Sequence, residues 1–187
     1  MIHDDMKQVT LAELQVALPD VLAAPKDNAP IEQLCLRPDF GERNFVDKMQ
    51  LTREFGIPGE RWNYAPWLKL DNGKADPRIQ VSILGTRVLD LVWRDRVNTP
   101  HPGDSFMADM DFSETNMPAG TLLNIGSATL RVTDKFNDAC VKWKVRYGKD
   151  AKDWVVIPEN IRHRLRGALC EVVRDGWVKT GDLIQKA

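Results

Sequence analysis

Apolar and polar residues alternate around a glycine in the second half of the chain, and this pattern restricts the possible folds more than any other feature. In GTLLNIGSATLRVT, residues 120–133, the alternation runs on both sides of the pair Gly126-Ser127. A period of two is typical of strands that bury one face. Because a Gly-X pair at that point suits a type II′ turn, the stretch predicts a β-hairpin.

Other segments extend the β pattern. Residues 31–52 indicate strand, loop and strand, and RIQVSIL at residues 78–84 is β-like. Near the end of the chain, residues 168–173 indicate a strand, Asp175-Gly176 a turn, and the residues that follow a short returning strand. A loop rich in Pro, Gly, Asn and Asp occupies residues 56–77.

Helices are expected at the margins of this sheet. Residues 10–24 begin with a possible cap at Thr10 and keep apolar spacing until Pro19 interrupts. GTRVLDLVWRD follows the RIQVSIL strand at helical spacing, and IPENIRHRLR looks helical with Pro158 near its start. The fold class is therefore mainly β, or β-rich α+β: a closed or curled β-barrel with a few short peripheral helices. We expect an N-terminal extension over residues 1–30 and the barrel domain over residues 31–187.

Length and composition place the chain among ordinary globular proteins. Its 187 residues suit one domain, and 26 basic against 27 acidic residues leave it near neutrality. A sequence pI of about 6.3 disfavours nucleic acid as a partner. There is no signal-peptide pattern and no apolar run near the ~20 residues of a membrane span, so we expect a cytoplasmic protein without membrane contact.

The three cysteines are far apart and form no CxxC pair, which argues against a disulfide framework. Cys140 lies in NDACVKWKVRYG, a stretch with two interpretations. Strict alternation from Val141 to Tyr147 favours a strand, whereas a cap at Asn137 or Asp138 and a stop at Gly148 favour a helix. In a helix, Cys140 would lie in the first turn, where the dipole and nearby cations stabilise a thiolate.

Common catalytic motifs are absent from the sequence. There is no Walker A loop, GxGxxG, HExxH or GxSxG, and the three histidines lack metal-ligand spacing. The carboxylates of MADMDFSE are more simply explained as a polar loop or edge strand than as an acid and base pair. On local pattern alone Cys140 remains either a buried small residue or a reactive thiol.

Two longer segments together resemble a known family. PGDSFMADMDFSETNMPAGTLLNIGSATLRVTDKFNDACVKW, followed by RGALCEVVRDGWVKTGD, is similar to the MOSC domain, named for the C-terminal domain of the molybdenum cofactor sulfurase. The family's GD, DFSE, GT, VT, cysteine, RG and GD elements appear here in the same order. The resemblance covers roughly residue 31 onward. Its upstream loop matches less well, because Glu60 and Trp62 replace the family's Asp and His on either side of Arg61.

The resemblance implies a β-barrel that binds the molybdenum cofactor, with Cys140 in the position of the family's functional cysteine. It also implies a set of side chains that hold the cofactor phosphate and pterin by charge-assisted hydrogen bonds. These candidates are Arg61, Asn116, Asn137, Lys142 and Arg166. The family pattern further favours the helix after Cys140, with Asp138 as its cap and with Val141, Val145 and Trp143 buried.

Three functions are compatible with this resemblance. In the first, Cys140 ligates molybdenum and the protein reduces N-hydroxylated bases or amidoximes with electrons from a separate redox partner. In the second, Cys140 carries a persulfide received from a cysteine desulfurase and passes the sulfur to a cofactor. In the third, the protein is a non-catalytic binding module that keeps the fold without the chemistry.

Overall fold

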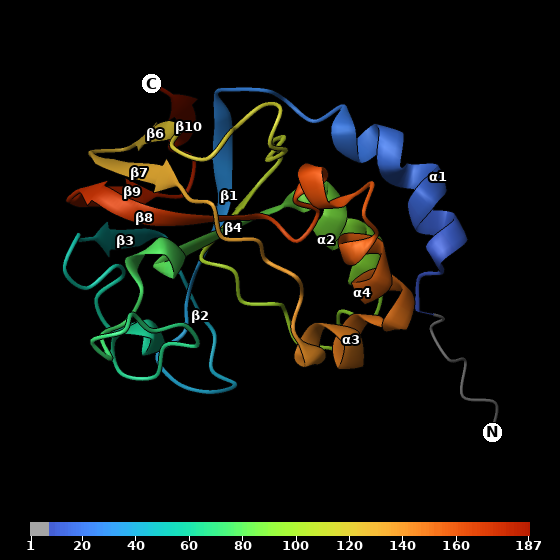
Figure 1. The fold of residues 1–187 in the computed structure, drawn as a ribbon, viewed down its shortest axis with the longest axis horizontal. Coiled ribbons are helices and arrows are strands. Elements are labelled where there is room, and N and C mark those ends of the chain that lie inside the picture. Colours follow the sequence, from blue (N-terminus) through green and yellow to red (C-terminus); the bar gives the residue numbers. More distant parts are fainter. Residues whose placement is uncertain (1–7) are drawn as a thin grey trace.

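A closed barrel of β-strands forms the centre of the molecule (Figure 1), in a computed structural model that describes residues 8–187. The strands follow the order β10-β6-β7-β8-β4-β5-β1, and β1 pairs with β10 to close the ring. Their bounds are β1 (Ala29–Leu36), β4 (Val81–Gly85), β5 (Phe106–Ala108), β6 (Leu122–Ile125), β7 (Ala128–Val132), β8 (Ala168–Arg174) and β10 (Leu183–Lys186). The predicted β-rich fold with a closed barrel is confirmed.

Strand β1 closes the barrel because different parts of it pair with different neighbours. Ala29 and Pro30 pair with β10, and the residues from Ile31 to Leu34 pair with β5 on the other side. Its last residues pair with the short strand β2 (Asn44–Val46), which lies outside the ring. The pair β4 and β5 is parallel, and the other pairings around the ring are antiparallel.

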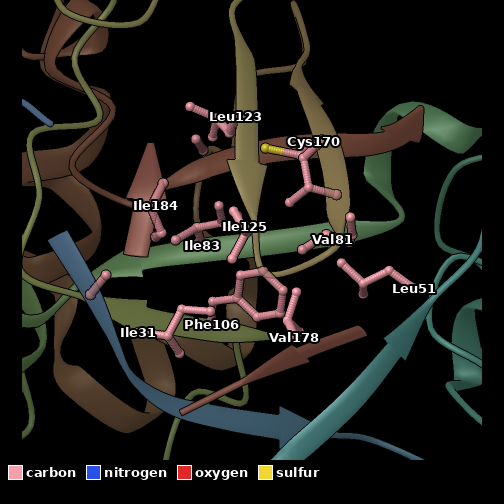
Figure 2. Packing of buried hydrophobic residues seen from close by; sticks show 14 of the residues in the cluster. Ile31, Leu51, Val81, Ile83, Phe106, Leu123, Ile125, Cys170, Val178 and Ile184 are labelled. Carbon is pink, nitrogen blue, oxygen red and sulfur yellow. The ribbon is translucent and has the colours of Figure 1, made fainter. Parts of the chain in front are cut away.

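Apolar side chains from every strand of the barrel fill its interior (Figure 2). The residues labelled there all have 1 % or less of their surface exposed and point toward a common centre: Ile31, Leu51, Val81, Ile83, Phe106, Leu123, Ile125, Cys170, Val178 and Ile184. Burial of this much apolar surface is the main favourable contribution to folding. The barrel is therefore a packed core.

A second apolar layer lies between the barrel and the helices, which gather on one side of it (Figure 1). Strands β4 and β5 contribute to both layers: Ile83 and Phe106 face the interior, whereas Leu84 and Met107 face the helices. A strand that is buried on both faces carries a continuous apolar run. This explains why VSIL lacks the alternation seen in the hairpin.

The described helices are α1 (Leu11–Leu22), α2 (Thr86–Val92), α3 (Val141–Tyr147) and α4 (Lys149–Val156), with 3-10 turns η1 (Arg61–Asn63), η2 (Pro77–Ile79) and η3 (Ile161–His163). Thr10 caps α1 through a capping box with Glu13, as its position predicts. The predicted interruption at Pro19 is wrong, since α1 continues to Leu22 and the Pro19 carbonyl accepts from Ala23. None of the helices within residues 8–187 is long and apolar enough to cross a membrane.

The predicted hairpin at Gly126-Ser127 is confirmed by the pairing of β6 with β7. Gly126 has φ of 57°, the left-handed value that the first position of a type II′ turn requires. The C-terminal return is only partly correct. Strand β9 (Gly176–Lys179) follows β8 through a turn, but it pairs with β3 (Lys48–Leu51) in a separate two-stranded sheet.

Two helix predictions also need correction. The segment 157–166 forms only the short turn η3, because Arg164 adopts the left-handed conformation and ends it. Helix α4 was not predicted, although Ala151, Trp154 and Val155 carry a helical apolar spacing and are all buried. These three side chains belong to the apolar layer between the helices and the barrel.

We predict that Gly167→Ala destabilises the fold much more than Gly181→Ala. Both glycines have left-handed φ values, 88° and 90°, but an added Cβ at Gly167 would lie 2.0 Å from the Ile83 carbonyl oxygen, and one at Gly181 would have nothing within 4 Å. Because the two glycines have nearly the same φ, the backbone strain of an alanine is similar at both positions. The difference between the two variants therefore measures the clash with Ile83. We expect a loss of about 1 kcal/mol for Gly181→Ala and about 3 kcal/mol or more for Gly167→Ala.

Urea denaturation of both variants measures this difference. Equal losses of stability would contradict the close approach of Gly167 to strand β4.

Candidate functional site

Cys140 is the residue at which helix α3 starts. It occupies the N-cap position, and its carbonyl oxygen accepts from the backbone N–H of Trp143 at 2.9 Å and of Lys144 at 3.4 Å. The helical interpretation of NDACVKWKVRYG is confirmed, and the strand is excluded. The predicted cap at Asp138 is wrong: Cys140 is the N-cap residue, and its side chain makes no capping hydrogen bond to the first turn.

Helix α3 presents a different face to the protein than the sequence predicted. Val141 and Val145 are 70 % and 74 % exposed, whereas Trp143 and Tyr147 are almost fully buried. The Trp143 and Tyr147 rings meet edge to face at 4.7 Å, and the Trp143 indole N–H donates to the Ala151 carbonyl of α4. Two large aromatic side chains bury more apolar area than two valines, so they decide the orientation of the helix.

Arg166 holds helix α3 against the barrel. Its Nη1 atom lies 2.7 Å from Oδ1 of Asp104, which is buried, and little of the Arg166 side chain is exposed. The guanidinium also lies over the Trp143 ring, 4.5 Å from its centre. Arg166, which the resemblance assigned to the cofactor, is thus bound on two sides by the protein itself.

Arg61 and Lys142, far apart in the sequence, meet around one aromatic ring. The Arg61 guanidinium lies 4.2 Å and the Lys142 ammonium 5.4 Å from the centre of the Phe40 ring. Phe40 is 62 % exposed, so this cluster lies at the surface. Within residues 8–187, neither Arg61 nor Lys142 has a carboxylate at ion-pair distance. Two uncompensated cations therefore lie next to the first turn of α3.

The two asparagines of the predicted set have separate positions. The Asn137 side chain donates to the Arg166 carbonyl oxygen at 3.4 Å, close to α3. Asn116 donates to the carbonyls of Lys26 and Asp111 and accepts from Lys186 of β10. Since β10 and α3 lie at opposite ends of the molecule (Figure 1), the structure does not bring Asn116 to Cys140.

The loop around Arg61 shows what its two departures from the family pattern do. The Glu60 carboxylate is buried and accepts from the backbone N–H of Arg37 at 2.9 Å and from its guanidinium at 3.2 Å. The Trp62 indole N–H donates to the Asp76 carbonyl at 3.1 Å. Both residues therefore brace the loop, and Trp62 ties it to the segment before η2.

Sequence reasoning missed a buried polar cluster beside the Arg166–Asp104 pair. Three of its atoms, Arg43 Nε, His101 Nε2 and Asp104 Oδ2, are buried without a hydrogen-bond partner in the described part of the chain. Gly103 lies among them: its N–H donates to His101 Nδ1, and an added Cβ would lie 3.2 Å from Arg43 Nε. The GD dipeptide was visible in the sequence, but its partners were not.

The other two cysteines are poor candidates for chemistry. Burial raises the pKa of the Cys35 thiol to about 11 and that of Cys170 to about 12, whereas Cys140 is exposed. Because the thiolate is the nucleophile and the metal ligand, Cys140 is the thiol available to a ligand. Within residues 8–187, no three or more His, Cys, Asp or Glu side chains gather into a metal site.

Two of the three carboxylates of MADMDFSE have structural partners. Asp109 pairs with Arg87 of α2 at 2.7 Å, and the buried Asp111 pairs with Lys26. These pairs fasten the segment after β5 to α2 and to the connector before β1.

The sequence and the fold were each compared with known proteins. A family model described as the MOSC domain matches residues 78–185. The YUAD protein from Bacillus subtilis shares the fold with a TM-score of 0.60 and 20% identity, over 84% of this chain and 94% of that one. YiiM from Escherichia coli follows at 0.55 and 15% identity, over 86% and 69% of the two chains. YiiM from Geobacillus stearothermophilus gives 0.51 and 11% identity, over 88% and 74%. No curated protein matches the sequence.

We predict that the buried histidine makes the fold sensitive to mild acid. Burial between Phe45 and Trp93 lowers the pKa of His101 from 6.5 to about 4. The unfolded chain therefore takes up a proton first as the pH falls, and the free energy of unfolding decreases between pH 6.5 and about 4, by ~3 kcal/mol in total.

Urea denaturation across this pH range tests the assignment. In His101→Asn, whose amide oxygen replaces Nδ1 as an acceptor for Gly103, the decrease should be much shallower. His163→Asn is the matched control, because His163 is more exposed and should leave most of the slope. An unchanged slope in His101→Asn would contradict the assignment.

Proposed function

The chain belongs to the MOSC domain family, and from this premise we propose that Cys140 ligates the metal of a bound molybdenum cofactor in a reductase of N-hydroxylated bases and amidoximes. MOSC domains are associated with the molybdenum cofactor. Reduction of N–OH to N–H consumes two electrons and two protons and releases water. A separate donor must therefore supply the electrons.

The exposed thiol at the start of α3 carries this proposal. Cys140 combines solvent access with the free N–H groups of the first helical turn, and the other two thiols are buried. A thiolate is a soft ligand that suits a transition metal of the cofactor's kind. The turn leaves the sulfur open to a ligand that approaches from solvent.

The surrounding side chains fit an anionic pterin cofactor. Arg61 and Lys142 flank Phe40, and neither has a carboxylate at ion-pair distance in the described part of the chain, so they can hold a phosphate by charge-assisted hydrogen bonds. The unpartnered buried atoms of Arg43, His101 and Asp104 add donors and an acceptor of the kind that a pterin ring requires. Asn116 is omitted from this set, because its side chain is used elsewhere.

Each residue then has a distinct task. When bound, the cofactor supplies the two-electron redox chemistry at molybdenum that removes oxygen from an N–OH group. Cys140 contributes its sulfur, and Arg61 and Lys142 neutralise the phosphate. Arg166 and Asn137 support helix α3 from within the protein: Arg166 packs on the Trp143 ring, and Asn137 donates to the Arg166 carbonyl oxygen.

Sulfur transfer is a second candidate, favoured by the same exposure of Cys140. A carrier cysteine must be reached by a cysteine desulfurase and by the acceptor, and a thiol at an open helix start meets both needs. In that case, incubation with a desulfurase leaves cyanide-releasable sulfur on Cys140, and the purified protein holds no molybdenum.

We predict that Cys140→Ala loses bound molybdenum. Protein produced in a host that makes the cofactor is analysed for molybdenum and pterin, normalised to folded protein. Wild type should contain both, and Cys140→Ala should contain several-fold less metal because the proposed sulfur ligand is gone. Cys35→Ala is the matched control, since it removes a buried thiol and should retain the metal. Equal molybdenum contents in all three proteins would overturn the proposal.

A further inference from the structure

The turn before Cys140 has a backbone conformation that its residue does not favour. Ala139 has φ of 59° and is fully buried. In the left-handed region, the Cβ of an L-residue approaches the next carbonyl oxygen, so residues other than glycine rarely adopt it. Such a conformation persists only where the surroundings fix it. Something must therefore hold Ala139.

Lys152 is the group that holds this turn. Its ammonium donates to the carbonyl oxygen of Asp138 at 3.1 Å and also to that of Ala139. Within residues 8–187, no other donor reaches these two oxygens. An ammonium has three N–H groups, so one lysine binds both converging carbonyls and fixes their relative direction. The bond to Ala139 is partly buried, and the bond to Asp138 lies at the surface.

Helix α4 gives Lys152 a rigid base. Ala151 accepts from the Trp143 indole N–H at 3.3 Å, and Ala151, Trp154 and Val155 are buried in the layer between helices and barrel. The neighbouring Lys149 pairs with Asp153 at the surface and does not touch the turn. Lys152 therefore connects a fixed helix to the segment that presents Cys140.

We propose that Lys152 is a positioning residue, which keeps Ala139 left-handed and thereby sets where Cys140 begins α3. Without the ammonium, two carbonyls lose their donor and Ala139 relaxes toward the right-handed or extended region. The chain then changes direction one residue before Cys140, and the thiol is displaced from its place at the start of α3. The inference rests on the proposed function only for what the thiol does once it is placed.

The reactivity of the Cys140 thiol tests the proposal without any cofactor. A dianionic aromatic disulfide reports it: the thiolate attacks one sulfur, and a coloured thiolate leaves. Lys152→Met removes the donor and keeps the length of the side chain, and Lys149→Met is the matched control on the same helix. Without the ammonium, the cost of a left-handed alanine lowers the population of this conformation by a factor of about five. We therefore expect Lys152→Met to react about fivefold more slowly. Lys149→Met and Lys152→Arg should react like wild type.

A double variant separates positioning from the loss of a nearby charge. Glycine adopts φ near 59° without a Cβ clash, so Ala139→Gly combined with Lys152→Met should restore most of the wild-type rate. If Lys152→Met reacts like wild type, or if the glycine fails to restore the rate, the proposal is overturned. Absence of molybdenum from the wild type would instead overturn the proposed function and leave this comparison valid.

Discussion

The buried ion pair between Arg166 and Asp104 is the contact on which the arrangement around Cys140 depends. Its two charged atoms lie 2.7 Å apart, and the side chains are 13% and 2% exposed. Asp104 precedes β5 and Arg166 precedes β8, so the pair joins the two segments that lead into these strands of the barrel. Removing one partner would leave an uncompensated buried charge, which is strongly destabilising. The GD and RG dipeptides, remote in the sequence, therefore form one structural unit.

A series of contacts connects this ion pair to the Cys140 thiol. The Arg166 guanidinium supports the Trp143 ring, Trp143 orients α3, and α3 begins at Cys140. The exposed side of the helix start then carries Lys142, which meets Arg61 across Phe40. The ion pair thus forms the base of the site, and its surface carries Arg61 and Lys142, which form no ion pair within residues 8–187. This charge distribution suits an anionic ligand at the surface without placing an unpaired charge in the core.

The sequence indicated the barrel because hairpin chemistry is local. Gly126-Ser127 and its alternating flanks are sufficient to specify β6 and β7. The partner of β9 could not be found in this way, since Asp175-Gly176 signals a turn but not which strand the chain meets next. In α3, Val141–Val145 and Trp143–Tyr147 have the same i, i+4 spacing, so periodicity cannot choose the buried face. Only the packing of Trp143 against Arg166 in the folded protein identifies the buried face of α3.

The residues proposed for the site came from different signals. Cys140 and Arg61 came from motif positions and Lys142 from its place beside Cys140, and the structure brings Arg61 and Lys142 together at one ring. Asn116 came from the same motif but lies among Lys26, Asp111 and Lys186. Arg43, His101 and Lys152 could not be found, because each acts through a partner that only the fold brings near it.

X-ray absorption at the molybdenum edge tests the central claim most directly, because it counts the sulfur atoms bound to the metal. Wild-type protein loaded with cofactor should show one more sulfur neighbour than Cys140→Ser loaded in the same way, with an oxygen in its place in the variant. The same sulfur count in both proteins would contradict ligation of the metal by Cys140.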